Sequence, residues 1–86
     1  MILSETEIRF ENAGTVLKTG LSAISNGDTV IDMKNVRRAD SSAVAVVLDW
    51  IRSAQKSGQP LHVINRPGSF DKLVRLYGLS GIVRID

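Results

Sequence analysis

Residues 29–58 read TVIDMKNVRRADSSAVAVVLDWIRSAQKSG, and this stretch decides the fold. Residues 29–33 are rich in β-branched side chains, which predicts a short central strand. A polar connection follows, and Asp40-Ser41-Ser42 then opens a helix that we expect to run to about Ser57. Gly58 can end that helix in a left-handed conformation, and Pro60 prevents its continuation. A strand that leads into a long helix is typical of a parallel α/β sheet.

The N-terminal third repeats this pattern. Residues 5–10 alternate polar and apolar side chains, with Ile8 and Phe10 on one face, which predicts a half-buried strand. Residues 13–24 carry apolar side chains at helical spacing, and Asn12 can cap that helix. Asn26-Gly27-Asp28 supplies the stop and the turn after it.

The C-terminal third predicts two further strands around a third helix. Residues 61–64 form the next strand, and Ser69 can cap the helix that follows the turn at residues 67–69. Gly78 closes this helix. The inward side chains of the helix are expected to be Phe70, Leu73, Val74 and Tyr77, and the last short strand is expected to contain Ile82, Val83 and Ile85.

The predicted order is therefore β-α-β-α-β-α-β. Strands that are separated by crossover helices pair in parallel with right-handed connections. We expect an α/β fold in which helices pack against a small sheet, with residues 1–86 forming a single domain.

Composition and charge exclude several functions. The 86 residues carry a formal net charge of +2, and Arg37-Arg38 is the one adjacent basic pair, too little for a nucleic-acid footprint. No cysteine is present, so disulfides and thiolate metal sites are excluded. We expect no signal peptide, and the longest apolar run, residues 43–48, is far shorter than the roughly 20 residues of a membrane span. The sequence thus favours a cytoplasmic protein that meets a membrane only through a partner.

Catalytic and cofactor chemistry is also missing from the sequence. Neither common phosphate-binding glycine loop is present. His62 is the single histidine and lies in a predicted strand, without a triad pattern around it. Asp32 and Asp40 are scattered carboxylates, for which turn and capping roles are favoured over a metal site. We expect no enzyme activity, no metal and no cofactor.

The segment Asp40-Ser41-Ser42 has two possible roles. Asp or Ser at a helix N-cap accepts a hydrogen bond from an unpaired backbone N–H, which explains one or two of these residues. Alternatively, Ser41 is an exposed hydroxyl at a helix N-terminus, where a partial positive charge can stabilise a phosphate or a polar group of a partner. The residues alone leave both roles open.

The same helix has an unusually wide apolar arc. Ala43, Val46 and Trp50 lie at helical spacing beside the stripe expected to face inward, which consists of Val44, Val47, Leu48, Ile51 and Ala54. The second face could be buried more deeply between the sheet and the other helices. We favour a docking face with Trp50 as its anchor, because tryptophan is enriched at interface hot spots.

The sequence resembles the STAS domain family, over about residues 5–86. The resemblance rests on the junction at residues 36–44, VRRADSSAV, and on Pro67-Gly68-Ser69-Phe70 and Leu76-Tyr77-Gly78-Leu79 near the end. Among STAS domains it looks most like the MlaB subunit of bacterial phospholipid-transport ABC complexes. Ala43 and Ala45 stand where the related anti-anti-sigma factors usually carry glycine.

The resemblance implies an accessory subunit without enzyme activity. It would bind the ATPase subunit of a complex that maintains outer-membrane lipid asymmetry, in the cytoplasm and peripheral to the inner membrane. The alternative that it implies is an anti-anti-sigma factor, controlled by an anti-sigma kinase that phosphorylates Ser41. The predicted partner-binding residues are Arg37, Arg38, Asp40, Ser41, Ser42, Ala43, Val46 and Trp50.

One departure from the family concerns the N-terminus. STAS domains usually begin with a hairpin of two strands, and this chain has room for one clear strand before its first helix. The first strand is either missing or reduced to Met1-Ile2-Leu3. An open sheet edge would result, through which we expect a homodimer to be possible.

Overall fold

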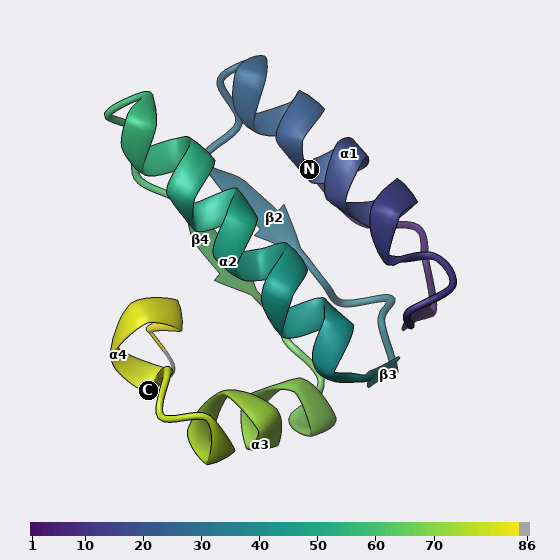
Figure 1. Cartoon of the computed structure of the whole chain (residues 1–86). Coiled ribbons are helices and arrows are strands. Elements are labelled where there is room, and N and C mark those ends of the chain that lie inside the picture. Colours follow the sequence, from purple (N-terminus) through teal and green to yellow (C-terminus); the bar gives the residue numbers. More distant parts are fainter. Residues whose placement is uncertain (85–86) are drawn as a thin grey trace.

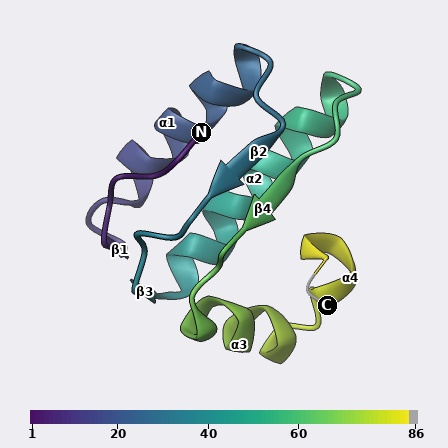
Figure 2. The ribbon, with the colours of Figure 1, turned by 180° about the vertical axis from the view of Figure 1, so that it is seen from behind.

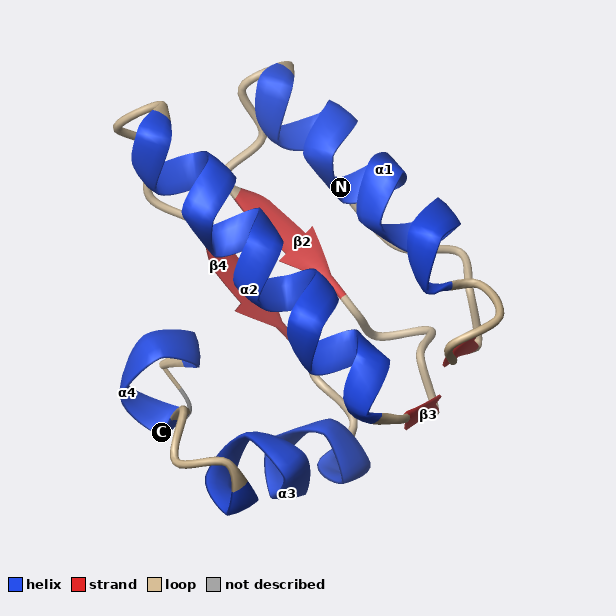
Figure 3. Ribbon diagram, viewed as in Figure 1, coloured by secondary structure: helices blue, strands red, loops and turns tan. Residues whose placement is uncertain are grey.

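Short elements follow one another along residues 1–84, the part of the chain that the computed structural model describes (Figure 1). Figure 3 distinguishes the helices from the strands. In chain order the elements are β1 Glu7–Ile8, α1 Ala13–Ser25, β2 Val30–Asp32, β3 Arg38–Ala39, α2 Ser41–Lys56, β4 His62–Ile64, α3 Gly68–Leu76 and α4 Ser80–Val83.

The strands pair in parallel and lie behind two helices. β2 pairs with β4, and β1 pairs with β3. Ile2 bridges to Asp32 on the other side of β2, so residues 1–3 run along this strand. Helices α1 and α2 lie side by side, and Figure 2 shows β2 and β4 in front of α2 and the N-terminal segment in front of α1. The parallel α/β class predicted from the sequence is confirmed.

Local glycine signals placed the helix ends correctly. Gly27, Gly58 and Gly78 have positive φ angles of 94°, 68° and 70°, and each follows α1, α2 or α3 closely. Such angles are strained for residues with a Cβ and are readily adopted by glycine.

The predicted last strand is wrong. Ile82 and Val83 belong to α4, a single helical turn, while Ile85 lies outside the described residues. Val83 is buried in this turn, so its burial does not require a strand. The polar connection predicted at residues 34–39 also contains β3, a two-residue strand too short to leave a hydrophobic pattern.

Three other expectations are corrected by longer-range contacts. Phe10 is 83% exposed while Ile8 is fully buried, because the chain turns after β1 and the alternation ends there. Tyr77 lies just beyond α3 and is 49% exposed. Ser69 does not cap α3, whose N-cap is Pro67; its hydroxyl accepts a hydrogen bond from the Ala39 backbone N–H at 3.3 Å instead.

Asn12 also acts differently from the predicted cap. It occupies the N-cap position of α1 without a side-chain capping bond. Its amide group donates to the Glu7 carbonyl at 2.8 Å and accepts from the Arg9 N–H at 2.7 Å. A neighbouring strand would use the same backbone groups, so Asn12 covers the outer edge of β1. This leaves Ile2 and Ser4 as the more accessible part of the edge, and dimerisation there stays a prediction that sedimentation at high concentration tests.

Trp50 joins the two long helices. Its side chain is fully buried, and its indole N–H donates to the Leu17 carbonyl oxygen at 3.0 Å. The ring lies against Gly20 so closely that a Cβ at this position would overlap it. Gly20 therefore allows α1 to approach α2 across the tryptophan ring.

We predict that Gly20→Ala destabilises the protein although alanine favours helices. Overpacking of this kind costs about 1–3 kcal/mol, against a gain of about 1 kcal/mol in helix propensity. Gly14→Ala is the matched control, because a Cβ there has no neighbour within 4 Å, and it should stabilise the protein. Urea unfolding followed by the fluorescence of Trp50, the single tryptophan, measures both. Equal stability of the two variants would contradict the close packing.

Candidate docking site

Asp40 organises the N-terminus of α2. Its backbone is extended, with φ −93° and ψ −173°, and its carboxylate accepts from the Ser42 N–H at 2.9 Å and from the Ser42 hydroxyl. The other carboxylate oxygen accepts from the Phe10 N–H at 3.1 Å. The predicted capping role of Asp40 is confirmed, and the same side chain fixes the turn that carries Phe10.

The electrostatics of Asp40 follow from these contacts. The hydrogen bond from the Ser42 hydroxyl is the main cause that lowers the pKa of Asp40. Desolvation opposes it, and the N–H groups of Ser42 and Phe10 and the charge of Arg9 lower the pKa further. Asp40 is therefore ionised at neutral pH. Its negative charge sits at the positive end of the α2 dipole, where it is favourable.

The two serines of the junction differ in their surroundings. Ser42 is half-buried and its hydroxyl is engaged by Asp40, whereas Ser41 is exposed in the first turn of α2. Within residues 1–84, the Ser41 hydroxyl makes no hydrogen bond. Ser41 is thus the hydroxyl of this pair that a partner can reach.

Arg37 and Arg38 extend the polar surface beside Asp40. Both are exposed, and Arg38 lies on β3. Together with Thr6 and Glu7 they line a shallow hollow, and Arg38 and Asp40 share a second hollow with Arg9. The predicted residues Arg37, Arg38, Asp40, Ser41 and Ser42 are therefore accessible or partly accessible around one junction.

The exposure predicted for Ala43, Val46 and Trp50 is wrong. Ala43 and Trp50 are fully buried and Val46 is 4% exposed. The sheet covers one side of α2 and α1 covers this other side, so even a small domain buries a wide apolar arc. These residues support the site from inside the fold.

Phe10 is the functional candidate that sequence reasoning missed. It is the most exposed large hydrophobic side chain among the described residues. It borders a groove of about 270 Å³ between α1 and α2, whose other lining residues are Ala13, Gly14, Leu17, Ser42, Ala45, Val46 and Asp49. The turn at residues 10–12 that exposes Phe10 depends on Asp40 and Asn12, so the alternation of residues 5–10 gave no sign of it.

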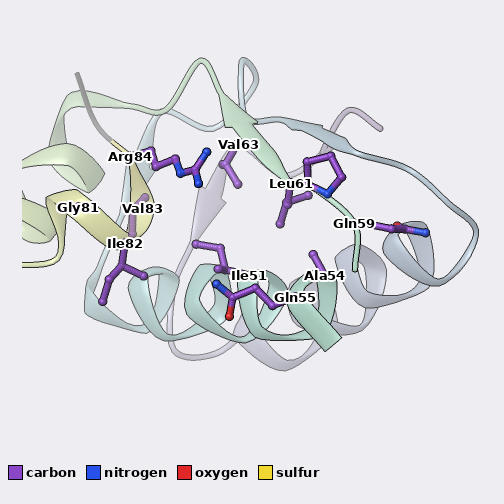
Figure 4. A pocket seen from close by; sticks show the side chains of 11 residues that line it. Ile51, Ala54, Gln55, Gln59, Leu61, Val63, Gly81, Ile82, Val83 and Arg84 are labelled. Atoms are coloured by element: carbon purple, nitrogen blue, oxygen red, sulfur yellow. The ribbon is translucent and has the colours of Figure 1, made fainter. Parts of the chain in front are cut away.

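Another hollow, of about 350 Å³, lies on the far side of α2, between α2, β4 and α4 (Figure 4). Ile51 and Ala54 of α2 face Leu61 and Val63 across it. Arg84 is the ionisable residue among its lining, so this hollow contains no acid–base pair. The side-chain oxygen of Gln59 is buried there without a hydrogen-bond partner among the described residues.

The two other residues considered from the sequence, Asp32 and His62, lie away from the α2 junction on β2 and β4. Asp32 accepts hydrogen bonds from the Asn65 side chain at 3.1 Å and the Lys34 N–H at 2.8 Å, and the Asn65 bond is the main cause that lowers the pKa of Asp32. His62 is exposed on β4.

Across residues 1–84 the structure contains no cluster of three metal-binding side chains. None of the helices described has the length and apolar character that crossing a membrane requires.

The geometry defines a small α/β domain with an exposed polar junction at the start of a long helix. The family model described as "MlaB, STAS domain" matches residues 5–84. The chain therefore belongs to the STAS domain family, in its MlaB type. A comparison with curated proteins gives no match. STAS domains are typically binding or regulatory domains without enzyme activity, so the family supports an accessory or regulatory role.

We predict that Asp40→Ala lowers the free energy of unfolding by about 1 kcal/mol at pH 7, because the cap of α2 is lost. Asp40→Asn should keep most of the cap without titrating. Because the folded-state pKa of Asp40 is lowered, its ionic contribution is present above the unfolded pKa, near 3.8, and is lost as the pH falls through the folded value. The stability of wild type should therefore approach that of Asp40→Asn as the pH falls below about 3.8. Urea unfolding at each pH tests this, and a constant difference would contradict it.

Proposed function

We propose that this chain is a non-enzymatic accessory subunit of a phospholipid-transport ABC complex. It binds the ATPase subunit of that complex and supports its assembly or activity, in the service of outer-membrane lipid asymmetry. The match of residues 5–84 to the MlaB type of STAS domain carries this proposal. The subunit works at the cytoplasmic side of the inner membrane, which it reaches through the ATPase and not by contact with lipid.

The docking surface is centred on Ser41. The first turn of a helix presents backbone N–H groups and a partial positive charge, which suit a polar or carbonyl group of a partner. Ser41 adds an exposed hydroxyl that can donate or accept. Arg37 and Arg38 precede it by four and three residues and can pair with acidic side chains of the ATPase.

The surroundings of Ser41 support a role in binding and not in catalysis. A nucleophilic serine needs a base within hydrogen-bond reach. Ser41 follows Asp40, but the carboxylate of Asp40 is occupied by Ser42 and Phe10. The single histidine lies on β4, a different element from the α2 junction.

One observation favours a second function. An exposed hydroxyl at a helix N-terminus is a position where a phosphate group is stabilised, so Ser41 could be the target of an anti-sigma kinase. The chain would then be an anti-anti-sigma factor whose docking is switched off by the added charge. Stoichiometric transfer of phosphate from ATP to Ser41 by a cognate kinase would favour this function over the transporter subunit.

We predict that Ser41→Asp weakens binding to the ATPase subunit by about tenfold or more, a loss of at least about 1.4 kcal/mol. The variant introduces a desolvated negative charge at the centre of the contact. Ser41→Ala, which removes the hydroxyl without adding charge or volume, should bind within a few-fold of wild type. Calorimetric titration of the purified subunits gives both affinities.

The stability of the variants separates docking from folding. Aspartate in the first turn of a helix is favourable for the dipole but is repelled by the ionised Asp40 beside it, so Ser41→Asp should unfold at about the same urea concentration as wild type. Lost binding by a stable Ser41→Asp protein therefore supports the docking surface. Unchanged affinity would remove Ser41 from the interface.

A further inference from the structure

The two glycines within α1 have opposite surroundings. Gly20 is buried against the Trp50 indole, which leaves no space for a Cβ. Gly14 is exposed, and a Cβ placed on it would meet no atom within 4 Å. A glycine in a helix interior costs about 1 kcal/mol relative to alanine, and Gly14, in the first turn of α1, costs less. Packing within the described chain therefore accounts for Gly20 but not for Gly14.

Gly14 faces the groove between α1 and α2. Ser42 and Ala45 are the small residues that line it from α2, and Phe10 stands at its border with 83% of its surface exposed. A single exposed apolar side chain is ordinary, but one that borders a partly apolar groove can act as an anchor for a partner. Small helix residues on both sides, with an aromatic side chain beside them, leave room for another helix to approach closely.

We infer that this groove receives a helix of the ATPase subunit, which inserts an apolar side chain beside Phe10 and places a basic residue near Asp49. The inference rests on the proposed function and identifies the chemistry of the partner segment. The groove adjoins the docking surface through Ser42, which is next to Ser41. One partner can therefore cover the groove and Ser41 together.

The charges around the groove indicate which charged side chain the partner helix carries. Asp49 is the ionisable residue in the lining of the groove. Two further carboxylates lie near Phe10: Asp40 accepts its backbone N–H, and Glu11, which is 72% exposed, pairs with the exposed Arg9 at 3.7 Å, a pair that solvent screens. Arg52 pairs with Asp49 at 3.0 Å, but both side chains are substantially exposed, so solvent screens this pair. A lysine or arginine on the partner is complementary to this rim.

The size of the groove fits a central contact and not a whole interface. A stable interface buries about 800 Å² on each partner. A groove of about 270 Å³ accommodates a few side chains. The contact must therefore continue over neighbouring surface, and the exposed junction around Ser41 provides that continuation.

Substitutions in the groove test the inference by titration with the purified ATPase subunit. A Cβ at Gly14 meets no atom within 4 Å, so Gly14→Leu should direct its side chain into the groove and weaken binding at least about tenfold. Phe10→Ser should weaken it similarly, and Asp49→Asn should weaken it several-fold. Thr15→Leu is the matched control, because Thr15 is exposed on α1 but does not line the groove, and it should bind like wild type.

The results distinguish the groove from the proposed function. If wild type does not bind the ATPase subunit, the proposed function fails. If wild type binds and Gly14→Leu binds equally well, the groove inference fails and the proposed function survives. Unfolding measurements on every variant exclude loss of the fold as a cause.

Crosslinking identifies the occupant directly. The chain has no cysteine, so Ala45→Cys introduces a unique thiol for a photoactivated crosslinker in the groove. A crosslink to a helix of the ATPase subunit that carries a basic residue beside an apolar one supports the inference. A crosslink to a second copy of this chain, or to a loop of the ATPase, overturns it.

Discussion

The contact between Trp50 and α1 is the constraint on which the arrangement of the other elements depends. The indole ring lies on Gly20 and donates to the Leu17 carbonyl, so one side chain fixes both the distance and the register of α1 against α2. Burying an aromatic ring of this size contributes several kcal/mol in a domain whose small size limits its core. The contact also sets the width of the groove beside it. Trp50 therefore shapes the candidate interface although it has no exposed surface.

Sequence reasoning succeeded where the determining contacts are local. The three long helices were predicted because apolar periodicity and the stops at Gly27, Gly58 and Gly78 act within a few residues of each helix. The last predicted strand failed because Ile82 and Val83 have β-branched side chains that are compatible with a helical turn when tertiary contacts bury it.

In the candidate site, too, the residues with local contacts were predicted and those that depend on distant contacts were not. Asp40 and Ser42 were predicted because capping joins residues two positions apart. The burial of Trp50 depends on Gly20, thirty positions away along the chain, and no local pattern distinguishes a face that meets another helix from one that meets a partner. The exposure of Phe10 likewise depends on Asp40, which lies thirty residues further on.

The hydrogen bonds that the Asp40 carboxylate accepts affect the two proposed functions differently. A phosphate on Ser41 would place about two negative charges on the residue that follows an ionised carboxylate. The repulsion would act on a group whose oxygens accept from both Ser42 and Phe10, so it would strain the cap of α2 and the turn that holds Phe10. An uncharged Ser41 that meets a polar group of an ATPase requires no such change. A phosphorylation switch would therefore act through disruption of this cap as well as through charge at the interface, whereas docking of an unmodified Ser41 would leave the cap in place.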